Sequence, residues 1–291
     1  MGATTSPAPK HASSKKSSLG YQLRFVVAPI TLVLIGLSIM LAPVVSTQYH
    51  NWQFGQEARQ YSQEIARQEE ATLAAELLEA QEWNAYAHTP QAIDPWTGAV
   101  DPNTQEYQHY LEQLNILPSM ARVRVPSVGI DLPIYHGTDE ETLAKGVGHL
   151  YGTDLPVGGV GTHSVLTGHT GIATATLFDN LSEVSLGDLI AVDALGETHT
   201  YQVKDINVVL PDNTDSIQVD PHSDLLTLIT CTPYGINSHR LLVTGERVFD
   251  QAVPEQSPFV IQPWMLWALG LSLAIIAITT LWIVLRKKGS Q

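Results

Sequence analysis

The chain has 291 residues and is acidic, with 29 aspartates and glutamates against 15 lysines and arginines and a formal net charge of −14. This balance excludes nucleic acid as a partner, because a phosphate backbone would be repelled rather than attracted. At this length, and with part of the chain apolar enough for a bilayer, we expect one globular domain with membrane and linker segments.

Two long apolar segments stand near the two ends of the chain. Residues 25–45 run for 21 positions without a charge, and residues 264–285 run for another 22. Each is long enough to cross about 30 Å of hydrocarbon at about 1.5 Å per residue, so two transmembrane helices are predicted and membrane lipid is an expected partner. The alternatives are a cleaved signal peptide for the first segment and a buried core helix for the second.

Basic residues flank both apolar segments on their outer sides. Four lie in the tail formed by residues 1–24 and three in the tail formed by residues 286–291, which predicts that both tails are cytoplasmic. Residues 46–263 are then extracytoplasmic, and their charges sum to 8 − 29 = −21. A signal peptide in place of the first span would leave this part of the chain outside as well.

A helical extension is predicted over residues 46–118. Residues 53–87 are rich in Gln, Glu and Ala with apolar positions at helical spacing, which indicates one long or two broken amphipathic helices. Prolines and a glycine then interrupt the pattern, and a short helix is predicted over residues 104–114.

Residues 119–250 consist of short runs rich in Val, Ile, Leu and Thr, separated by Gly, Pro, Asn and Asp, a texture that predicts a barrel or sandwich of β-strands. One helix is predicted at Glu140–Lys145, because Thr138 and Glu141 have the spacing of a capping box. Residues 251–263 are expected to link this domain to the second span. The predicted strands are Ala121–Val125, Leu132–Tyr135, Ser164–Gly168, Leu189–Val192, Thr198–Val209, Leu225–Cys231 and Arg240–Phe249.

Cys231 is the single cysteine of the chain, and it lies in the part expected to face an oxidising compartment. It ends an apolar run, and a seven-residue loop separates it from a second run that begins at His239 and Arg240. If the two runs pair as an antiparallel hairpin, Cys231 and Arg240 lie opposite each other with Cβ atoms about 5 Å apart. A fixed cation favours the thiolate and can bind the oxyanion that forms when sulfur attacks a peptide carbonyl.

A cysteine nucleophile needs an imidazole as acid and base, and the chain has eleven histidines. His169 is predicted to be this base, because it closes the strand-like segment of residues 161–169. The end of a strand holds a side chain rigidly and leaves it reachable. His239 is expected on the opposite face from Arg240, because side chains alternate along a strand.

A metal site is a second reading of the histidines at positions 149, 163 and 169. The chain lacks a second cysteine, an HxxxH pair and a matching pattern of carboxylates, so no metal is predicted. The acidic surface is read as a solvated face, with a basic partner surface as the alternative.

Three segments resemble the sortase family of cysteine transpeptidases. T-L-I-T-C-T-P-Y-G-I-N-S-H-R-L-L-V-T-G-E-R, around Cys231 and Arg240, is similar to the sortase cysteine and arginine signature. G-T-H-S-V-L-T-G-H, ending at His169, is similar to the strand that presents the sortase histidine, and G-V-G-H-L-Y-G-T-D-L-P-V-G-G lies upstream of it. In many relatives an arginine directly follows the histidine, where this chain has Thr170.

This resemblance covers residues 122–248 and implies a mainly β fold, a closed β-barrel with short helices. The helical extension would precede the barrel, and the two transmembrane helices would flank the whole. The resemblance also implies that His169 is the acid and base, Cys231 the nucleophile and Arg240 the stabiliser of the oxyanion or substrate.

Class C sortases join pilin subunits. They carry an extension with an Asp-Pro-aromatic lid and often keep a C-terminal span. Asp94, Pro95 and Trp96 supply the tripeptide here, in the predicted extension, and the second apolar segment supplies the span. The lid reading pairs Asp94 with Arg240 and lets Trp96 shield the thiol. An ordinary proline turn is the alternative.

The implied function is pilus assembly. Cys231 would cleave the Thr-Gly bond of an LPxTG-like sorting signal on a pilin or surface protein through a thioacyl intermediate, which a lysine amine of another pilin subunit resolves. No metal, nucleotide or redox cofactor is expected, because each step exchanges one acyl bond for another. The alternatives are a sortase that anchors proteins to peptidoglycan, a related peptidase that only hydrolyses, and a non-catalytic envelope adaptor.

Overall fold

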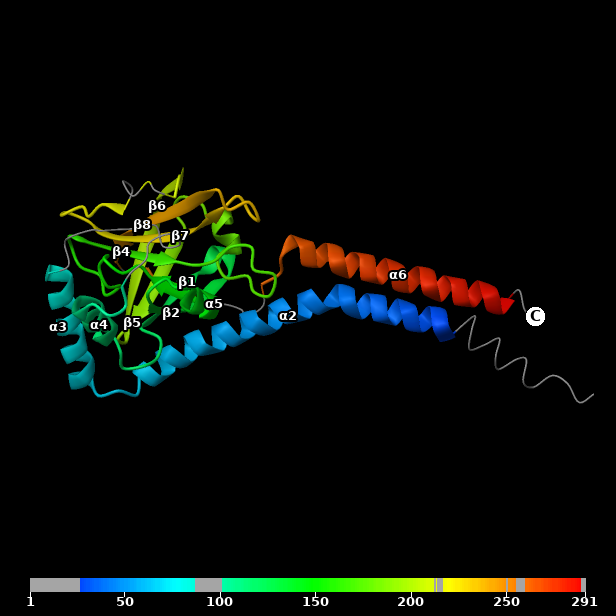
Figure 1. Cartoon of the computed structure of the whole chain (residues 1–291), viewed down its shortest axis with the longest axis horizontal. Helices are drawn as coiled ribbons and strands as arrows, with labels where there is room; N and C mark the ends of the chain where they lie inside the picture. The colour runs from blue at the N-terminus through cyan, green and yellow to red at the C-terminus, as the bar shows by residue number, and fades with distance from the viewer. Residues whose placement is uncertain are drawn as a thin grey trace, which may run out of the picture. The chain divides into compact units, whose positions relative to one another are not determined.

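The structure is a computed structural model, and it describes residues 27–86, 101–211, 213, 217–249, 251–254 and 260–288 (Figure 1). These residues belong to two compact units. Residues 46–260 form the unit that contains every strand, and the apolar helical segments up to Val45 and from Ile261 form the other. The candidate functional site lies within residues 46–260.

Eight strands close into one barrel in the order β1-β2-β3-β4-β7-β8-β6-β5. Two neighbouring pairs are parallel, β2 with β3 and β4 with β7, and the others are antiparallel. Closure pairs every strand on both sides and leaves no open sheet edge. The strands are β1 Ala121–Val125, β2 Ile130–His136, β3 Val147–His149, β4 Thr162–Thr167, β5 Leu189–Ala194, β6 Glu197–Val209, β7 Asp224–Thr232 and β8 His239–Val248.

The predicted closed β-barrel is confirmed, and each of the seven predicted strands overlaps an observed one. The eighth strand, β3, was not predicted, because its three residues are too few to show an alternating pattern. Gly148 is its central residue. A Cβ atom there would collide with the carbonyl oxygen of Gly137, so the strand depends on a close approach of two backbone segments.

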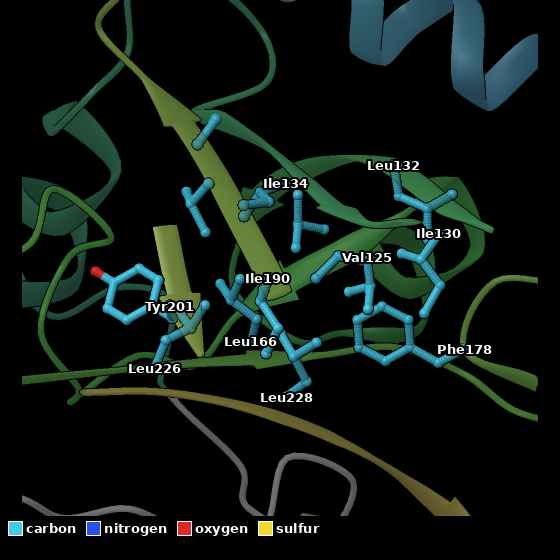
Figure 2. Packing of buried hydrophobic residues seen from close by; sticks show 14 of the residues in the cluster. Val125, Ile130, Leu132, Ile134, Leu166, Phe178, Ile190, Tyr201, Leu226 and Leu228 are labelled. Atoms are coloured by element: carbon cyan, nitrogen blue, oxygen red, sulfur yellow. The ribbon is translucent and has the colours of Figure 1, made fainter. Parts of the chain in front are cut away.

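The barrel interior is a continuous apolar core. Leu166, Ile190, Tyr201, Leu226 and Leu228 come from four different strands and point toward one another in Figure 2. Burying each aliphatic side chain of this size stabilises the fold by about 1.5–3 kcal/mol. The alternation of Val, Ile and Leu along the strands therefore determines which faces turn inward.

Within the residues that the structure describes, five helices and two short 3-10 turns accompany the strands. The first predicted span and the first part of the extension form one continuous helix, so the expected boundary at residue 45 is not a break in the helix. The predicted extension helices are interrupted at residues 66–69, and the short helix ends two residues earlier than predicted. The helices are α2 Ala28–Ile65, α3 Glu70–Tyr86, α4 Gln105–Glu112, α5 Glu140–Lys145 and α6 Pro263–Lys288, and the turns are η2 Pro126–Val128 and η3 Asp179–Glu183.

The bounds predicted for α5 are correct, but its predicted capping box is wrong. The N-cap is Asp139, whose carboxylate accepts a hydrogen bond from the Thr142 amide at 3.0 Å. Thr138 lies one residue too early for this position. Aspartate is as effective an N-cap as serine or threonine, so the sequence spacing alone did not distinguish the two.

The C-terminal half of α2 packs on the barrel. Its residues Phe54, Ala58, Tyr61 and Ile65 are buried. The Tyr61 hydroxyl donates to the Met120 carbonyl oxygen at 2.9 Å and accepts from the Leu195 amide at 3.1 Å. This part of the extension therefore belongs to the domain that contains the barrel.

A buried ion pair also joins α2 to the barrel. Arg122 on β1 donates to both carboxylate oxygens of Asp131 on β2, at 2.7 and 3.0 Å. Arg59 on α2 donates to the same carboxylate at 2.9 Å. A displacement of α2 would take Arg59 away from the buried Asp131 carboxylate, and the loss of a partner from a buried ion pair costs free energy. This contact therefore fixes the position of α2 on the β1–β2 hairpin.

Helices α3 and α4 are anchored on the barrel by specific hydrogen bonds. The Asn84 side chain donates to the Leu155 carbonyl oxygen at 3.1 Å and accepts from the Leu155 amide at 2.7 Å. On α4, the Tyr110 hydroxyl lies 2.9 Å from Nδ1 of His149 and accepts from the Gly137 amide at 3.0 Å. The two described helices on either side of residues 87–100 are thus attached to the barrel.

Helices α2 and α6 are long and apolar enough to cross a membrane. Two such helices are consistent with the predicted membrane anchoring. The extracytoplasmic position of the barrel and the cytoplasmic position of both tails stay predictions from the charge pattern.

His149 makes the stability of the domain depend on pH. Its Nε2 lies 2.8 Å from the Asp154 carbonyl oxygen, so it carries the proton, and Nδ1 accepts from Tyr110. Burial lowers the pKa of His149 from 6.5 to about 4, so the unfolded chain takes up this proton first as the pH falls. We expect His149 alone to lower the free energy of unfolding by roughly 3 kcal/mol between about pH 6.5 and pH 4.

Urea unfolding of the purified chain at a series of pH values measures this slope. His149→Gln should make this slope less steep without removing it, because burial also lowers the pKa of His199 to about 4. His222→Gln, at an exposed position, should leave the slope unchanged. An equally steep slope in the His149→Gln variant would show that another group carries the pH dependence.

Candidate active site

The candidate site lies on the outer face of the barrel, at one end of β4, β7 and β8. Side chains alternate along β7, where Leu226 and Leu228 belong to the interior core and Ile229 belongs to a second, smaller cluster outside it. Cys231 follows Ile229 by two residues and therefore shares its outer face. The second cluster consists of Leu150, Val165, Ile217, Ile229 and Leu242.

Cys231 and Arg240 are directly opposed in the β7–β8 hairpin, as the sequence predicts. Cys231 is 9% exposed and Arg240 is 7% exposed. The Arg240 Nη1 donates to the carbonyl oxygens of Asn237 and His239, each at 3.3 Å. The guanidinium is therefore held by the loop that joins the two strands, next to the thiol position.

His169 arrives at the same end of the barrel through the parallel pairing of β4 with β7. Thr167 is in register with Ile229, and the Gly168 amide donates to the Ile229 carbonyl oxygen at 3.1 Å. His169 follows Thr167 by two residues, as Cys231 follows Ile229. The register therefore brings the three predicted residues to neighbouring strand ends.

Burial sets the electrostatics around His169. It lowers the pKa of His169, and the negative charge of Glu140 partly offsets this shift. Burial raises the pKa of Asp179 to about 6, against the stabilising hydrogen bond from the Gly171 amide at 2.8 Å. The imidazole is therefore held in the neutral form that can accept a proton at neutral pH.

Gly168 explains why a glycine precedes the histidine. A Cβ atom at this position would lie 2.8 Å from the Phe178 ring, and Phe178 is fully buried. The Phe178 amide donates to the His169 carbonyl oxygen at 3.1 Å. No local spacing relates Phe178 to His169, so the sequence pattern does not predict this contact.

The remaining predicted residues have separate outcomes. Asp94, Pro95 and Trp96 lie outside the described residues. Within the described part of the chain, no group of three His, Cys, Asp or Glu side chains could hold a metal ion. His163, considered above as a metal ligand, instead contacts the Gln218 carbonyl oxygen at 2.9 Å and the Thr227 hydroxyl at 2.7 Å.

Comparison with known proteins identifies relatives of this domain. A family model described as a sortase domain matches residues 123–248. The crystal structure of sortase C-1 from Actinomyces oris is 56% identical, with a TM-score of 0.60, and the match covers 61% of this chain and 98% of that one. Sortase A from Corynebacterium diphtheriae is 44% identical, with a TM-score of 0.62, over 70% of this chain and 96% of that one.

Curated relatives are more distant. Sortase A from Bacillus anthracis is 29% identical over 133 residues, which is 46% of this chain and 61% of that protein. The chain thus spans about three fifths of the length of this relative.

Replacing Gly168 with alanine tests the packing behind His169. The added methyl group must displace the buried Phe178 ring, so Gly168→Ala should lower the free energy of unfolding by about 1–3 kcal/mol. Gly36→Ala, whose Cβ atom meets nothing within 4 Å, is the matched control. Urea unfolding monitored by circular dichroism measures both, and equal stability of the two variants would contradict a rigid contact at Gly168.

Proposed function

Since the chain belongs to the sortase family, we propose that it is a membrane-anchored cysteine transpeptidase that links pilin subunits. The observation that carries this proposal is the register that pairs Cys231 with Arg240 and delivers His169 to the same end of the barrel. Structural relatives named sortase C-1, from Actinomyces oris and Streptococcus pneumoniae, support the class C reading.

In the proposed first step, the Cys231 sulfur attacks the carbonyl carbon of the Thr-Gly bond in an LPxTG-like signal. His169 accepts the thiol proton, which its neutral form permits. Negative charge develops on the carbonyl oxygen, and the Arg240 guanidinium stabilises it. The C–N bond then breaks, His169 returns the proton to the leaving amine, and a thioester on Cys231 remains.

In the proposed second step, an uncharged lysine amine of another pilin subunit attacks the thioester. His169 takes a proton from the amine and returns it to the sulfur as the C–S bond breaks. The product is an amide between two subunits, and the thiol is restored. The partners are therefore a protein with a sorting signal and a protein with an accessible lysine, held at the membrane surface on the extracytoplasmic side.

Mass spectrometry of the full chain in detergent, with an LPxTG peptide and a lysine-bearing peptide, tests both steps. The wild type should form a thioester on Cys231 and an amide-linked product. Cys231→Ala should form neither, and Arg240→Ala should lower the rate by about 10²–10³-fold, because the oxyanion loses a charged donor.

Product formation by Cys231→Ala at the wild-type rate would refute the proposal. A product formed with glycine peptides in preference to lysine would instead favour anchoring to peptidoglycan. Hydrolysis that amines do not accelerate would favour a peptidase.

We further propose that Asp94 and Trp96 restrain access to Cys231 as a lid. A lid mutant of the Corynebacterium diphtheriae enzyme is among the similar structures, at 45% identity, and supports this reading. The lid variant Asp94→Ala/Trp96→Ala should form the thioester several-fold faster than the wild type, because the sulfur becomes easier to reach.

The matched control for the lid is Tyr86→Ala/Asp101→Ala. It removes an exposed aromatic side chain and an exposed carboxylate on either side of residues 87–100. Equal rates of thioester formation in the lid variant, the control and the wild type would count against a lid.

A further inference from the structure

Two threonine hydroxyls join the segment that carries His169 to the strand that carries Cys231. Thr170 directly follows His169, and Thr230 directly precedes Cys231. Their Oγ1 atoms lie 2.7 Å apart. The Thr230 Oγ1 also donates to the carbonyl oxygen of Gly168, at 2.7 Å. The two contacts thus link Thr170, which follows His169, to Thr230, which precedes Cys231, and link Thr230 to Gly168, which precedes His169.

The donors in this chain can be assigned by counting protons. Each hydroxyl has one proton to donate. If Thr230 donates to the Gly168 carbonyl, it must accept from Thr170 across the 2.7 Å contact. The longer contact from Thr170 Oγ1 to the Phe178 carbonyl oxygen, at 3.2 Å, is then the weaker option. The assignment gives two short hydrogen bonds in one direction, an arrangement in which each bond strengthens the next.

Burial makes this arrangement costly to break. Thr170 is 8% exposed and Thr230 is 2% exposed, so neither hydroxyl is readily satisfied by water when its partner is removed. On its other side, the His169 carbonyl oxygen accepts from the Phe178 amide at 3.1 Å, and the Phe178 ring packs where a Gly168 side chain would be. The backbone of residues 168–170 is therefore held by β7 on one side and by Phe178 on the other.

The size of the Thr170 side chain suits this contact. Its side chain is small enough to be buried and short enough to reach β7. The interaction that it makes there is with the Thr230 hydroxyl.

We propose that Thr170 and Thr230 are positioning residues, which set the placement of the His169 imidazole relative to the Cys231 thiol. The inference rests on the proposed function for the identity of the base and the nucleophile. The two hydroxyls act through the backbone of residues 168–170, which they hold in register with the end of β7. A displacement of about 1 Å in a catalytic group lowers the rate of a reaction by about 10²-fold, so a small loss of this register has a measurable effect.

The test uses the full chain in detergent and four variants: Thr170→Val, Thr230→Val, the double variant and Thr170→Ser. Valine keeps the shape of threonine and removes the hydroxyl, whereas serine keeps the hydroxyl. With an LPxTG peptide and a lysine-bearing acceptor, each valine variant should lower kcat by about 10- to 100-fold and leave KM within about twofold. Thr170→Ser should retain activity close to that of the wild type.

The double variant tests whether the two hydroxyls act as one unit. Because either substitution breaks the same chain, Thr170→Val/Thr230→Val should be no slower than the slower single variant. Multiplication of the two single effects would show that the hydroxyls act independently, and it would overturn the proposal.

Alkylation of Cys231 by iodoacetamide as a function of pH provides a readout that needs no peptide. The dependence of the alkylation rate on pH in Thr170→Val should shift from that of the wild type toward that of His169→Ala. The reason is that a displaced imidazole no longer accepts the thiol proton as it does in the wild type. Thr200→Val is the matched control for stability. Thr200 lies on β6, is buried, and donates to the Gln251 carbonyl oxygen at 3.2 Å. Its alkylation profile should equal that of the wild type.

These outcomes separate the inference from the proposed function. A wild type that is alkylated but forms no thioester with the peptide would contradict the proposed substrate, and the alkylation profiles would still test the threonine pair. A wild-type profile in Thr170→Val, with a rate loss no larger than in Thr200→Val, would assign the two hydroxyls to stability alone and overturn the proposal.

Discussion

The parallel pairing of β4 with β7 is the contact on which the arrangement of the candidate site depends. The β7–β8 hairpin is local, because seven residues separate Cys231 from the next strand, and it brings Cys231 and Arg240 together without help from the rest of the chain. His169 comes from a distant segment. Its approach requires that Thr162–Thr167 lie in register along Asp224–Ile229, and this pairing is one of the contacts that close the barrel. The core of alternating Leu, Val and Ile stabilises that closure, so packing far from the site determines its geometry.

Burial also sets the chemistry of this end of the barrel. Removal of the His169 imidazole from water lowers its pKa and favours the neutral base. Arg240 is almost fully buried but keeps two carbonyl acceptors from its own loop. Fixed carbonyl dipoles therefore replace part of the hydration of this positive charge. The guanidinium is preorganised to stabilise an oxyanion. The hydroxyls of Thr170 and Thr230 are buried as well. Loss of either hydrogen-bond partner therefore costs free energy, since water does not readily replace it.

The helical extension is part of the domain that carries the site. Asp131 binds arginines from both β1 and α2, and Asn84 and Tyr110 attach the next two helices to the barrel. The described residues on both sides of positions 87–100 are therefore held on the barrel. Within one acidic chain, these few buried polar contacts determine where the extension lies.

The elements that depend on local pattern can be predicted from the order of the residues. Short runs rich in Val, Ile, Leu and Thr predicted seven strands, and a seven-residue loop predicted the pairing of Cys231 with Arg240. Uninterrupted apolar runs predicted two helices able to cross a membrane. The remaining features are visible only in the folded domain: strand β3, the continuity of α2, the Asp139 cap, the partner of β4, and the contact between Thr170 and Thr230. Each of these depends on segments far apart in the chain or on a choice between equivalent local partners. Such contacts form only when loop closure and core packing bring the segments together, and no local spacing encodes them.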